Sequence, residues 1–368
     1  YERYLNTVAS GLKAANNLIT VNPVYIEAQD IIDTLYTETV RNNNAPDVYL
    51  MSAENSDKAY LLGLMLENDS YGDIYNEKIY GKAAIKSASY KGKLYGYPVS
   101  FDMPVMVYNK KYASSVDSYD EIKQISDNYQ VTEENQNITK VFDFDASDML
   151  INYPYVGRYM DIGGDVSENA DIFTIDELKF KRALKEYASL KNTFGIDRNE
   201  STHDSCLDEF TQNKLLYTIV NTSDLKKIDD SGVTYGIIPV PYLSEGLESV
   251  PMSITTLAVV NPYTSDISVA KTVARAISYD YAADMQALSG HVSARADLIK
   301  KGRKADNTDY NMLHDIYSDS IVKAKYVGVQ NIYTRYEILI HQIWDGKSID
   351  DAYNEFHKGV ESFLTSIR

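Results

Sequence analysis

The chain has 368 residues, of which 44% are hydrophobic and 24% are charged, an ordinary composition for a globular protein. The formal net charge of −17 argues against nucleic acid as a partner, because phosphate binding needs clustered lysine and arginine. The single cysteine, Cys206, cannot form an internal disulfide and leaves the redox compartment undecided. The length predicts two lobes or two domains.

The first part of the chain alternates helical and extended patterns. Apolar residues at helical spacing predict a helix over the first eighteen residues, and a short strand follows from Ile19 to Ile26. A second helix is expected from about Asp30 to Arg41, and a strand from Asp47 to Met51. This alternation predicts an α/β lobe with a mainly parallel sheet.

The most informative segment runs from Leu94 to Tyr112. A Gly-Tyr-Pro turn leads into an apolar run that a single carboxylate, Asp102, interrupts. A charge inside a buried strand is costly unless it has a partner. One interpretation is a cleft where strands cross between two lobes and a ligand lies against them. The other is a bend at an exposed strand end with a solvated Asp102, and spacing alone slightly favours it.

Beyond Tyr112 the patterns predict a second α/β lobe. Ser118 is expected to cap a helix, and the polar residues 126–148 predict a surface loop. The remaining predicted elements are helices at about 147–160, 175–194 and 269–288, strands at 215–220, 233–240 and 254–260, and a nearly all-helical tail from about 310 to 368.

No pattern in the sequence supports catalysis or metal binding. The carboxylates of Phe142–Asp148 lack the Gly turn of a calcium loop, and His203–Cys206 lacks the second cluster of a zinc site. There is no Gly-x-Ser-x-Gly elbow, no P-loop and no Gly-x-Gly-x-x-Gly. Trp344, at a helix end, is expected to pack. We therefore expect no enzyme, no metal and no cofactor.

The Leu94–Tyr112 segment resembles the crossover strand of the extracellular solute-binding proteins of ABC transporters, of the maltose-binding (carbohydrate) type. Asn213 stands where the family usually has Gly. Further segments similar to the family occur in the same order, namely Ala45–Tyr49, Leu61–Glu67, Phe210–Ile219, Tyr235–Pro239 and Gly290–Asp297.

The resemblance implies an α/β, two-lobed, periplasmic-binding-protein-like fold with a hinge and an inter-lobe ligand cleft. The family's first strand precedes the first helix, whereas this sequence begins in the helix, so that strand is expected to be absent or the lobe to be built differently. The implied division is 1–100 with about 254–305 for lobe 1, 105–250 with about 306–368 for lobe 2, and hinge crossings near 101–104, 251–253 and 300–310.

The resemblance also implies a function. The expected protein is the extracellular substrate-binding component of an ABC importer, which captures a small polar solute, a carbohydrate first, by lobe closure. We expect a monomer that docks on permease membrane subunits and is anchored through a removed N-terminal leader. The alternatives are a non-transport binding or scaffold module with a degenerate pocket, and a glycoside hydrolase, which needs two carboxyl groups about 5 to 9 Å apart.

Candidate ligand contacts follow from the same resemblance. Asp102 and Glu54 would accept hydrogen bonds from ligand hydroxyls, and Asn221 would open a helix whose N–H groups face the cleft. The other candidates are Met51, Tyr153, Tyr155, Arg158, Ser223, Tyr333 and Tyr336. Met51 and Ser223 fall where sugar binders often carry aromatic residues. With 32 Tyr and 1 Trp, the chain offers tyrosines as stacking faces, which implies a smaller or more polar ligand, or a lost binding function.

Overall fold

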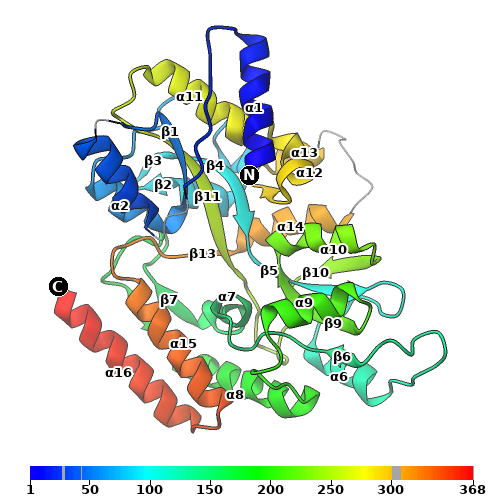
Figure 1. Cartoon of the computed structure of the whole chain (residues 1–368). Coiled ribbons are helices and arrows are strands. Elements are labelled where there is room, and N and C mark those ends of the chain that lie inside the picture. Colours follow the sequence, from blue (N-terminus) through cyan, green and yellow to red (C-terminus); the bar gives the residue numbers. More distant parts are fainter. Residues whose placement is uncertain (27–29, 43, 301–307, 368) are drawn as a thin grey trace.

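The computed structural model describes residues 1–26, 30–42, 44–300 and 308–367. The chain forms two lobes, each built on a β-sheet with helices around it (Figure 1). Lobe 1, at the top of Figure 1, contains the blue N-terminal segment and the yellow helices. Lobe 2, below it, contains the green segments and the red C-terminal helices. The predicted two-lobed α/β architecture is therefore confirmed.

The sheet of lobe 1 has the strand order β1-β11-β4-β12, and β13 pairs with β11. These strands are β1 (Val48–Ser52), β4 (Gly96–Asp102), β11 (Met252–Val260), β12 (Val292–Ser293) and β13 (Ile321–Val322). All of these pairs except β11 with β13 are antiparallel, so the prediction of a mainly parallel sheet is wrong. The reason is that β11 lies between β1 and β4 and runs opposite to both.

The sheet of lobe 2 has the order β10-β5-β9-β6. Its strands are β5 (Pro104–Asn109), β6 (Lys140–Phe142), β9 (Leu215–Asn221) and β10 (Tyr235–Ile238). Only β6 and β9 pair in parallel. Two small hairpins complete the strands, β2 (Ser89–Tyr90) with β3 (Lys93–Leu94), and β7 (Met160–Ile162) with β8 (Phe173–Ile175).

Helices cover both sheets. Those of lobe 1 are α1 (Glu2–Ala15), α2 (Ile31–Tyr36), α3 (Ser56–Leu61), α4 (Glu77–Tyr80), α5 (Lys82–Ala88), α11 (Ile267–Arg275), α12 (Met285–Ser289) and α13 (Asp297–Lys300). Those of lobe 2 are α6 (Tyr119–Asp127), α7 (Met149–Asn152), α8 (Glu177–Phe194), α9 (His203–Thr211), α10 (Leu225–Ser231), α15 (Gln330–Trp344) and α16 (Ile349–Ile367). Helix α14 (Thr308–Asp319) contacts both α5 and β10.

Short 3-10 and π turns connect several of these helices. The 3-10 turns are η2 (Ala53–Asn55), η3 (Tyr153–Tyr155), η4 (Gly157–Tyr159), η5 (Thr222–Asp224) and η7 (Ala282–Asp284), and the π turns are η1 (Thr37–Arg41) and η6 (Ala276–Asp280).

Three local predictions need correction. Ile19–Ile26 forms no strand, because a strand needs a neighbouring strand for its backbone groups, and no pairing of the described residues includes this segment. The helix expected over 147–160 is reduced to α7 and two 3-10 turns, since Pro154 removes a helical N–H and disfavours helix before it. The polar segment 126–148 contains strand β6, where Val141 and Phe142 are buried.

Two smaller predictions are confirmed. The Ser118 side chain accepts a hydrogen bond from the backbone N–H of Glu121 and caps α6, and Trp344 is buried in the lobe 2 core. The residue boundaries between the lobes remain predictions. The third predicted crossing, near 300–310, lies partly outside the described residues.

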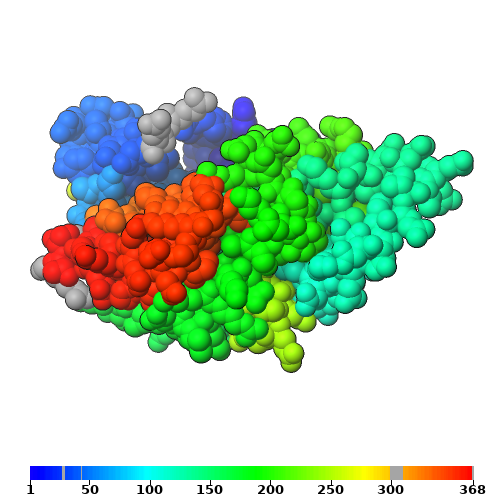
Figure 2. Space-filling view, turned by 90° about the horizontal axis from the view of Figure 1, so that it is seen from below, coloured from blue at the N-terminus to red at the C-terminus, as the bar shows by residue number. Residues whose placement is uncertain are grey.

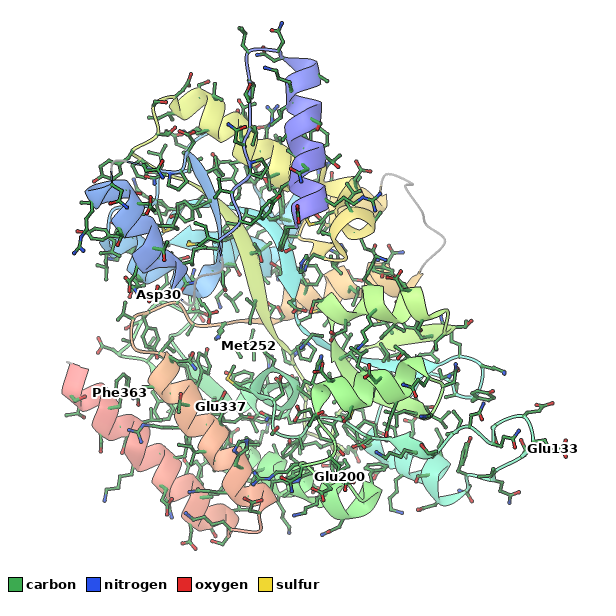
Figure 3. All side chains as sticks on the ribbon, viewed as in Figure 1. Asp30, Glu133, Glu200, Met252, Glu337 and Phe363 are labelled. Carbon is green, nitrogen blue, oxygen red and sulfur yellow. The ribbon has the colours of Figure 1, made fainter. Side chains whose placement is uncertain are left out.

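The hydrophobic core continues from one lobe into the other. A single cluster of buried residues includes Phe101 of β4, Val105 of β5, and Leu313 and Tyr317 of α14. The Tyr317 ring stacks on Phe101 with 3.9 Å between ring centroids, and its hydroxyl is hydrogen-bonded to Thr255 Oγ1 at 2.7 Å. Figure 3 shows Met252, the first residue of β11, at the centre of the molecule where the lobes meet.

Seen from below, lobe 2 fills most of the face shown in Figure 2, with α15 and α16 (orange and red) on one side and the cyan segment after β5 projecting on the other. Among the helices of the described ranges, none combines the length and apolar character that crossing a bilayer requires.

The shared core predicts a large effect of truncating Phe101. We expect Phe101→Ala to lower the free energy of unfolding by about 3 to 5 kcal/mol, because it removes a buried ring and leaves a cavity between β4 and α14. Urea denaturation followed by circular dichroism measures this loss. Leu178→Ala, at an exposed position, is the control and should change the free energy by less than about 0.5 kcal/mol. Similar losses in the two variants would contradict the shared core.

Candidate ligand-binding site at the crossing between the lobes

Asp102 lies where β4 of lobe 1 passes into β5 of lobe 2. Its Oδ1 accepts hydrogen bonds from Thr222 Oγ1 at 2.8 Å and from the backbone N–H of Ser223 at 3.0 Å. Its Oδ2 accepts a third bond, from Ser223 Oγ at 2.8 Å. Burial raises the pKa of Asp102, although these three bonds act in the opposite direction. The interpretation that spacing alone slightly favoured, a simply solvated Asp102, therefore differs from the structure, in which the chain itself supplies three donors to this carboxylate.

The backbone reinforces the same contact. The N–H of Thr222 donates to the carbonyl oxygen of Met103 at 3.0 Å, and the N–H of Met103 donates to Thr222 Oγ1 at 3.3 Å. Thr222 opens η5 directly after β9, so the turn between β4 and β5 is tied to the end of the neighbouring strand. We call Asp102, Met103, Thr222 and Ser223 the crossing site.

A second polar contact joins the lobes at Glu54. The Glu54 carboxylate forms an ion pair with Lys323 Nζ, just beyond β13, and accepts a hydrogen bond from Ser52 Oγ at 3.2 Å. Lys323 Nζ also lies 5.5 Å from the centroid of the Tyr333 ring. Both charged side chains are largely buried, Glu54 at 28% exposure and Lys323 at 12%. The contribution of such an ion pair to stability depends on its geometry.

The four predicted tyrosines lie in the core of lobe 2. Tyr153, Tyr155, Tyr333 and Tyr336 are each 2% exposed or less. The Tyr153 ring lies edge-on to Tyr333 and Tyr336, at centroid distances of 6.4 and 5.6 Å, and the Tyr155 hydroxyl is hydrogen-bonded to that of Tyr119. In this structure, these rings pack in the core of lobe 2, Tyr155 against Tyr119 and Tyr187, and offer no free face to a ligand.

The remaining predicted residues are dispersed. Met51 is 3% exposed and packs in the core on one face of the lobe 1 sheet. Arg158 is exposed and forms an ion pair with Glu248 at 3.1 Å. Asn221 ends β9, where its backbone N–H donates to Asp224 Oδ2 at 2.9 Å. Of the predicted residues, the structure thus brings together Asp102, Ser223 and Asn221.

His203 is a polar neighbour of this site that the sequence did not indicate as functional. Its Nε2 lies 3.0 Å from Asp224 Oδ2, and its backbone N–H donates to Asp145 Oδ2 at 3.0 Å. The bond to Asp224 raises the pKa of His203, with burial opposing the shift. His203 opens α9 after the Thr202 cap, but nothing in the sequence pairs it with Asp224.

A second feature that sequence reasoning missed is an aromatic pair beside Asp102. The ring of Tyr1 stacks on that of His291, with centroids 4.2 Å apart and planes 12° apart, and the Tyr1 hydroxyl is hydrogen-bonded to Ser100 Oγ. β12 pairs with β4 through Val292 and Phe101, so the same register brings His291 next to Asp102. Both rings are partly exposed, and burial lowers the pKa of His291.

Within the residues that the structure describes, no three His, Cys, Asp or Glu side chains are placed to hold a metal ion. The polar groups at the crossing between the lobes are thus hydrogen-bond donors and acceptors from side chains and backbone.

The sequence matches the family model of the bacterial extracellular solute-binding proteins over residues 8–268, which is more than half of the chain. The protein belongs to this family. No curated protein matches the sequence.

Solved structures similar to this solute-binding protein cover nearly its whole length. A cyclo/maltodextrin-binding protein in complex with maltotetraose aligns over 99% of this chain and 94% of its own, with a TM-score of 0.83 and 15% identity. The extracellular solute-binding protein of Staphylococcus aureus in complex with maltose covers 99% and 95%, with a TM-score of 0.82 and 16% identity. MalX of Streptococcus pneumoniae in complex with maltopentaose covers 99% and 97%, with a TM-score of 0.80 and 15% identity. At these identities, the similarity shows the fold.

The crossing site of this solute-binding protein predicts that Asp102 matters for stability. Asp102→Ala should lower the free energy of unfolding by about 2 to 3 kcal/mol, because it removes the acceptor of the part-buried N–H and hydroxyl of Ser223 and leaves the Thr222 hydroxyl with a longer bond to the carbonyl oxygen of Phe101, at 3.4 Å. Asp102→Asn retains an oxygen for these donors and is the matched control, with an expected loss below about 1 kcal/mol. Denaturation midpoints and slopes in urea measure both. Equal losses would show that the hydrogen bonds are not the cause.

His203 predicts a pH dependence of stability. Because its pKa is raised above 6.5 in the folded protein, the pair with Asp224 contributes fully below pH 6.5 and is lost as the pH rises through the folded value. We therefore expect the stability difference between wild type and His203→Gln to shrink as the pH rises from about 6 to 8.5. Urea denaturation at several pH values tests this, and parallel curves for the two proteins would refute it.

Proposed function

We propose that the protein captures a small polar solute, a carbohydrate first, between its two lobes and delivers it to the permease of an ABC importer. The observation that carries the proposal is the fold match over 99% of the chain to proteins solved with maltotetraose, maltose and maltopentaose. Membership of the extracellular solute-binding family supports the same role. We further propose that the protein is a binding protein without enzymatic activity, a monomer, and anchored to the cell surface through an N-terminal leader.

The polar groups at the crossing suit a neutral hydroxylated ligand. Asp102 accepts three hydrogen bonds from neutral groups, and a carboxylate has about four acceptor positions, so one direction on Oδ2 is left for a ligand hydroxyl. Glu54 and Lys323 neutralise each other and together offer an acceptor and donors. In the part of the chain that the structure describes, the groups that bond Asp102 are neutral, so an anionic solute would face the Asp102 charge without a compensating cation, which disfavours it.

Lobe closure explains how such a site gains affinity. A ligand that contacts groups of both lobes binds the closed arrangement better and shifts the population toward it by its differential affinity. Ser223 and Asn221 would approach the ligand from lobe 2, and Glu54 from lobe 1. The partly exposed Tyr1–His291 pair provides an aromatic face beside Asp102, of the kind that packs against sugar rings.

The second candidate function is a non-transport scaffold with a degenerate pocket. One observation favours it: the four tyrosines at predicted stacking positions are buried in the core of lobe 2. For Met51, Tyr153, Tyr155, Tyr333 and Tyr336, direct ligand contact would require these side chains to leave the core when the lobes open.

Thermal melting with defined solutes separates the two candidates. A ligand that binds only the folded protein stabilises it by about 2.7 kcal/mol at 100 times its Kd, so maltose or maltotetraose should raise the melting temperature, whereas glutamate should not. Titration calorimetry should then show about tenfold weaker binding for Glu54→Gln, equivalent to about 1.4 kcal/mol.

Glu67→Gln, which alters an exposed pair with Lys93, is the control variant and should bind like the wild type. Cooperative melting that no sugar, amino acid, peptide or polyamine shifts would favour the scaffold instead.

A further inference from the structure

A fully buried lysine stands in the segment that follows β13. Lys325 has a side-chain exposure of 0%, and its Nζ donates to the carbonyl oxygen of Lys86 at 2.7 Å and to that of Ser89. The same ammonium forms an ion pair with Glu168 Oε1 at 3.2 Å. Lys86 and Ser89 belong to α5 and β2 of lobe 1, whereas Glu168 lies in the loop between β7 and β8 of lobe 2. One side chain therefore holds groups of both lobes.

Neighbouring contacts join the same surfaces. Glu168 Oε2 accepts from the backbone N–H of Lys91, at the tip of the β2–β3 hairpin, at 2.8 Å. Asp57 Oδ2 of α3 accepts from the N–H of Val327 at 2.6 Å. The N–H of Lys325 itself donates to the carbonyl oxygen of Ser167 at 2.8 Å. We call Lys325, Glu168 and the backbone groups that they bind the Lys325 clasp.

The hydrogen bonds of the clasp fit one relative position of the two lobes. An ammonium group has three donors, and Lys325 has three acceptors, so every donor is satisfied only in this arrangement of the lobes. Taking a charge out of water is costly, and a buried ion pair seldom stabilises a protein more than well-packed apolar residues do. The clasp therefore defines one relative position of the lobes and adds little to overall stability.

We propose that the Lys325 clasp is a latch between the lobes, and that its release is required for them to change their relative orientation. Lys325 is a positioning residue in this view, because it touches no solute at the crossing site. The consequence for solute affinity rests on the proposed function, but the latch itself does not.

The charged groups around the clasp are Glu168, Asp161 and Asp165 of lobe 2, and Lys86, Asp57 and Lys91 of lobe 1. Burial lowers the pKa of Lys325 to about 8, with Glu168 opposing the shift. The ammonium form, which makes the ion pair with Glu168, is therefore the major form at pH 7, and the latch is tested at that pH.

A distance measurement between the lobes tests the latch without any solute. Spin labels at Leu61→Cys on α3 and Leu178→Cys on α8, both exposed positions in different lobes, report the separation by double electron–electron resonance. The buried Cys206 is replaced by Ala in all proteins compared. The measurement is made at pH 7 on the wild-type background, on Lys325→Met and on the control Lys93→Met.

At pH 7 we expect the wild type and the control to show the same latched distance. Lys325→Met should show a broader or shifted distribution. If Lys325→Met fails to fold, Glu168→Gln is measured instead, and it should also shift the distribution. Distributions of a folded Lys325→Met, or of Glu168→Gln in its place, that superimpose on the wild type would overturn the latch.

Titration of the same proteins with maltotetraose separates the two proposals. A shifted distance distribution of Lys325→Met in a protein that binds no sugar would leave the latch standing and remove the proposed function. If the protein binds sugar and the distances in Lys325→Met equal those of the wild type, the proposed function stands and the latch is overturned.

Discussion

The arrangement of this protein depends on the carboxylate of Asp102. It ends a buried strand of one lobe, and its three hydrogen bonds fix the first residues after a strand of the other lobe. Met103 and Thr222 exchange two further bonds. The strands that cross between the lobes are therefore held at one point by charge-assisted bonds, while a continuous apolar cluster surrounds that point. Other polar links between the lobes include the ion pair of Glu54 with Lys323 and the bonds of Lys325 Nζ to the carbonyl oxygens of Lys86 and Ser89, and both lysines lie on the segment that leaves β13. Hydrogen bonds and ion pairs, which are directional, thus lie where the chain crosses between the lobes. The apolar cluster around them contributes packing, which has no preferred direction.

Sequence reasoning singled out Asp102 but did not predict its contacts. Spacing alone slightly favoured a solvated Asp102 at an exposed bend, whereas the structure gives this carboxylate three hydrogen-bond donors from the chain itself. The identity of these donors depends on how β9 lies beside β5, which is a tertiary pairing of residues far apart in the sequence. The strand expected at Ile19–Ile26 and the parallel sheet failed for the same reason. Local alternation predicts that an element exists, but not which strand lies next to it. His203 with Asp224, and Tyr1 with His291, come from separate elements and have no local signature.

The tyrosines show how the same residue type serves two purposes. A tyrosine ring contributes apolar area, and its hydroxyl needs a partner when it is buried. In lobe 2 the Tyr155 and Tyr119 hydroxyls satisfy each other, and the Tyr187 hydroxyl donates to the carbonyl oxygen of Ala146 at 2.6 Å. In this structure, the tyrosines at positions that resemble ligand contacts pack in the core. The sequence pattern around a tyrosine does not distinguish a ring that packs in a core from a ring that faces a sugar. The partly exposed aromatic pair lies elsewhere, beside the carboxylate.

The position of β11 in the lobe 1 sheet has a consequence for the order in which the protein folds. β1 and β4 are neighbours of β11 on either side and do not pair with each other, so Leu50 finds its partner only at Ala258. A growing chain carries both strands with open edges until β11 has been made. Pairings over such long separations are slow to form, and they leave strand edges exposed in the meantime. For a protein of an extracellular family, the lobe 1 sheet can therefore be completed only after Met252–Val260 has been synthesised, so a chain shorter than this cannot yet resist threading through a narrow pore by means of that sheet.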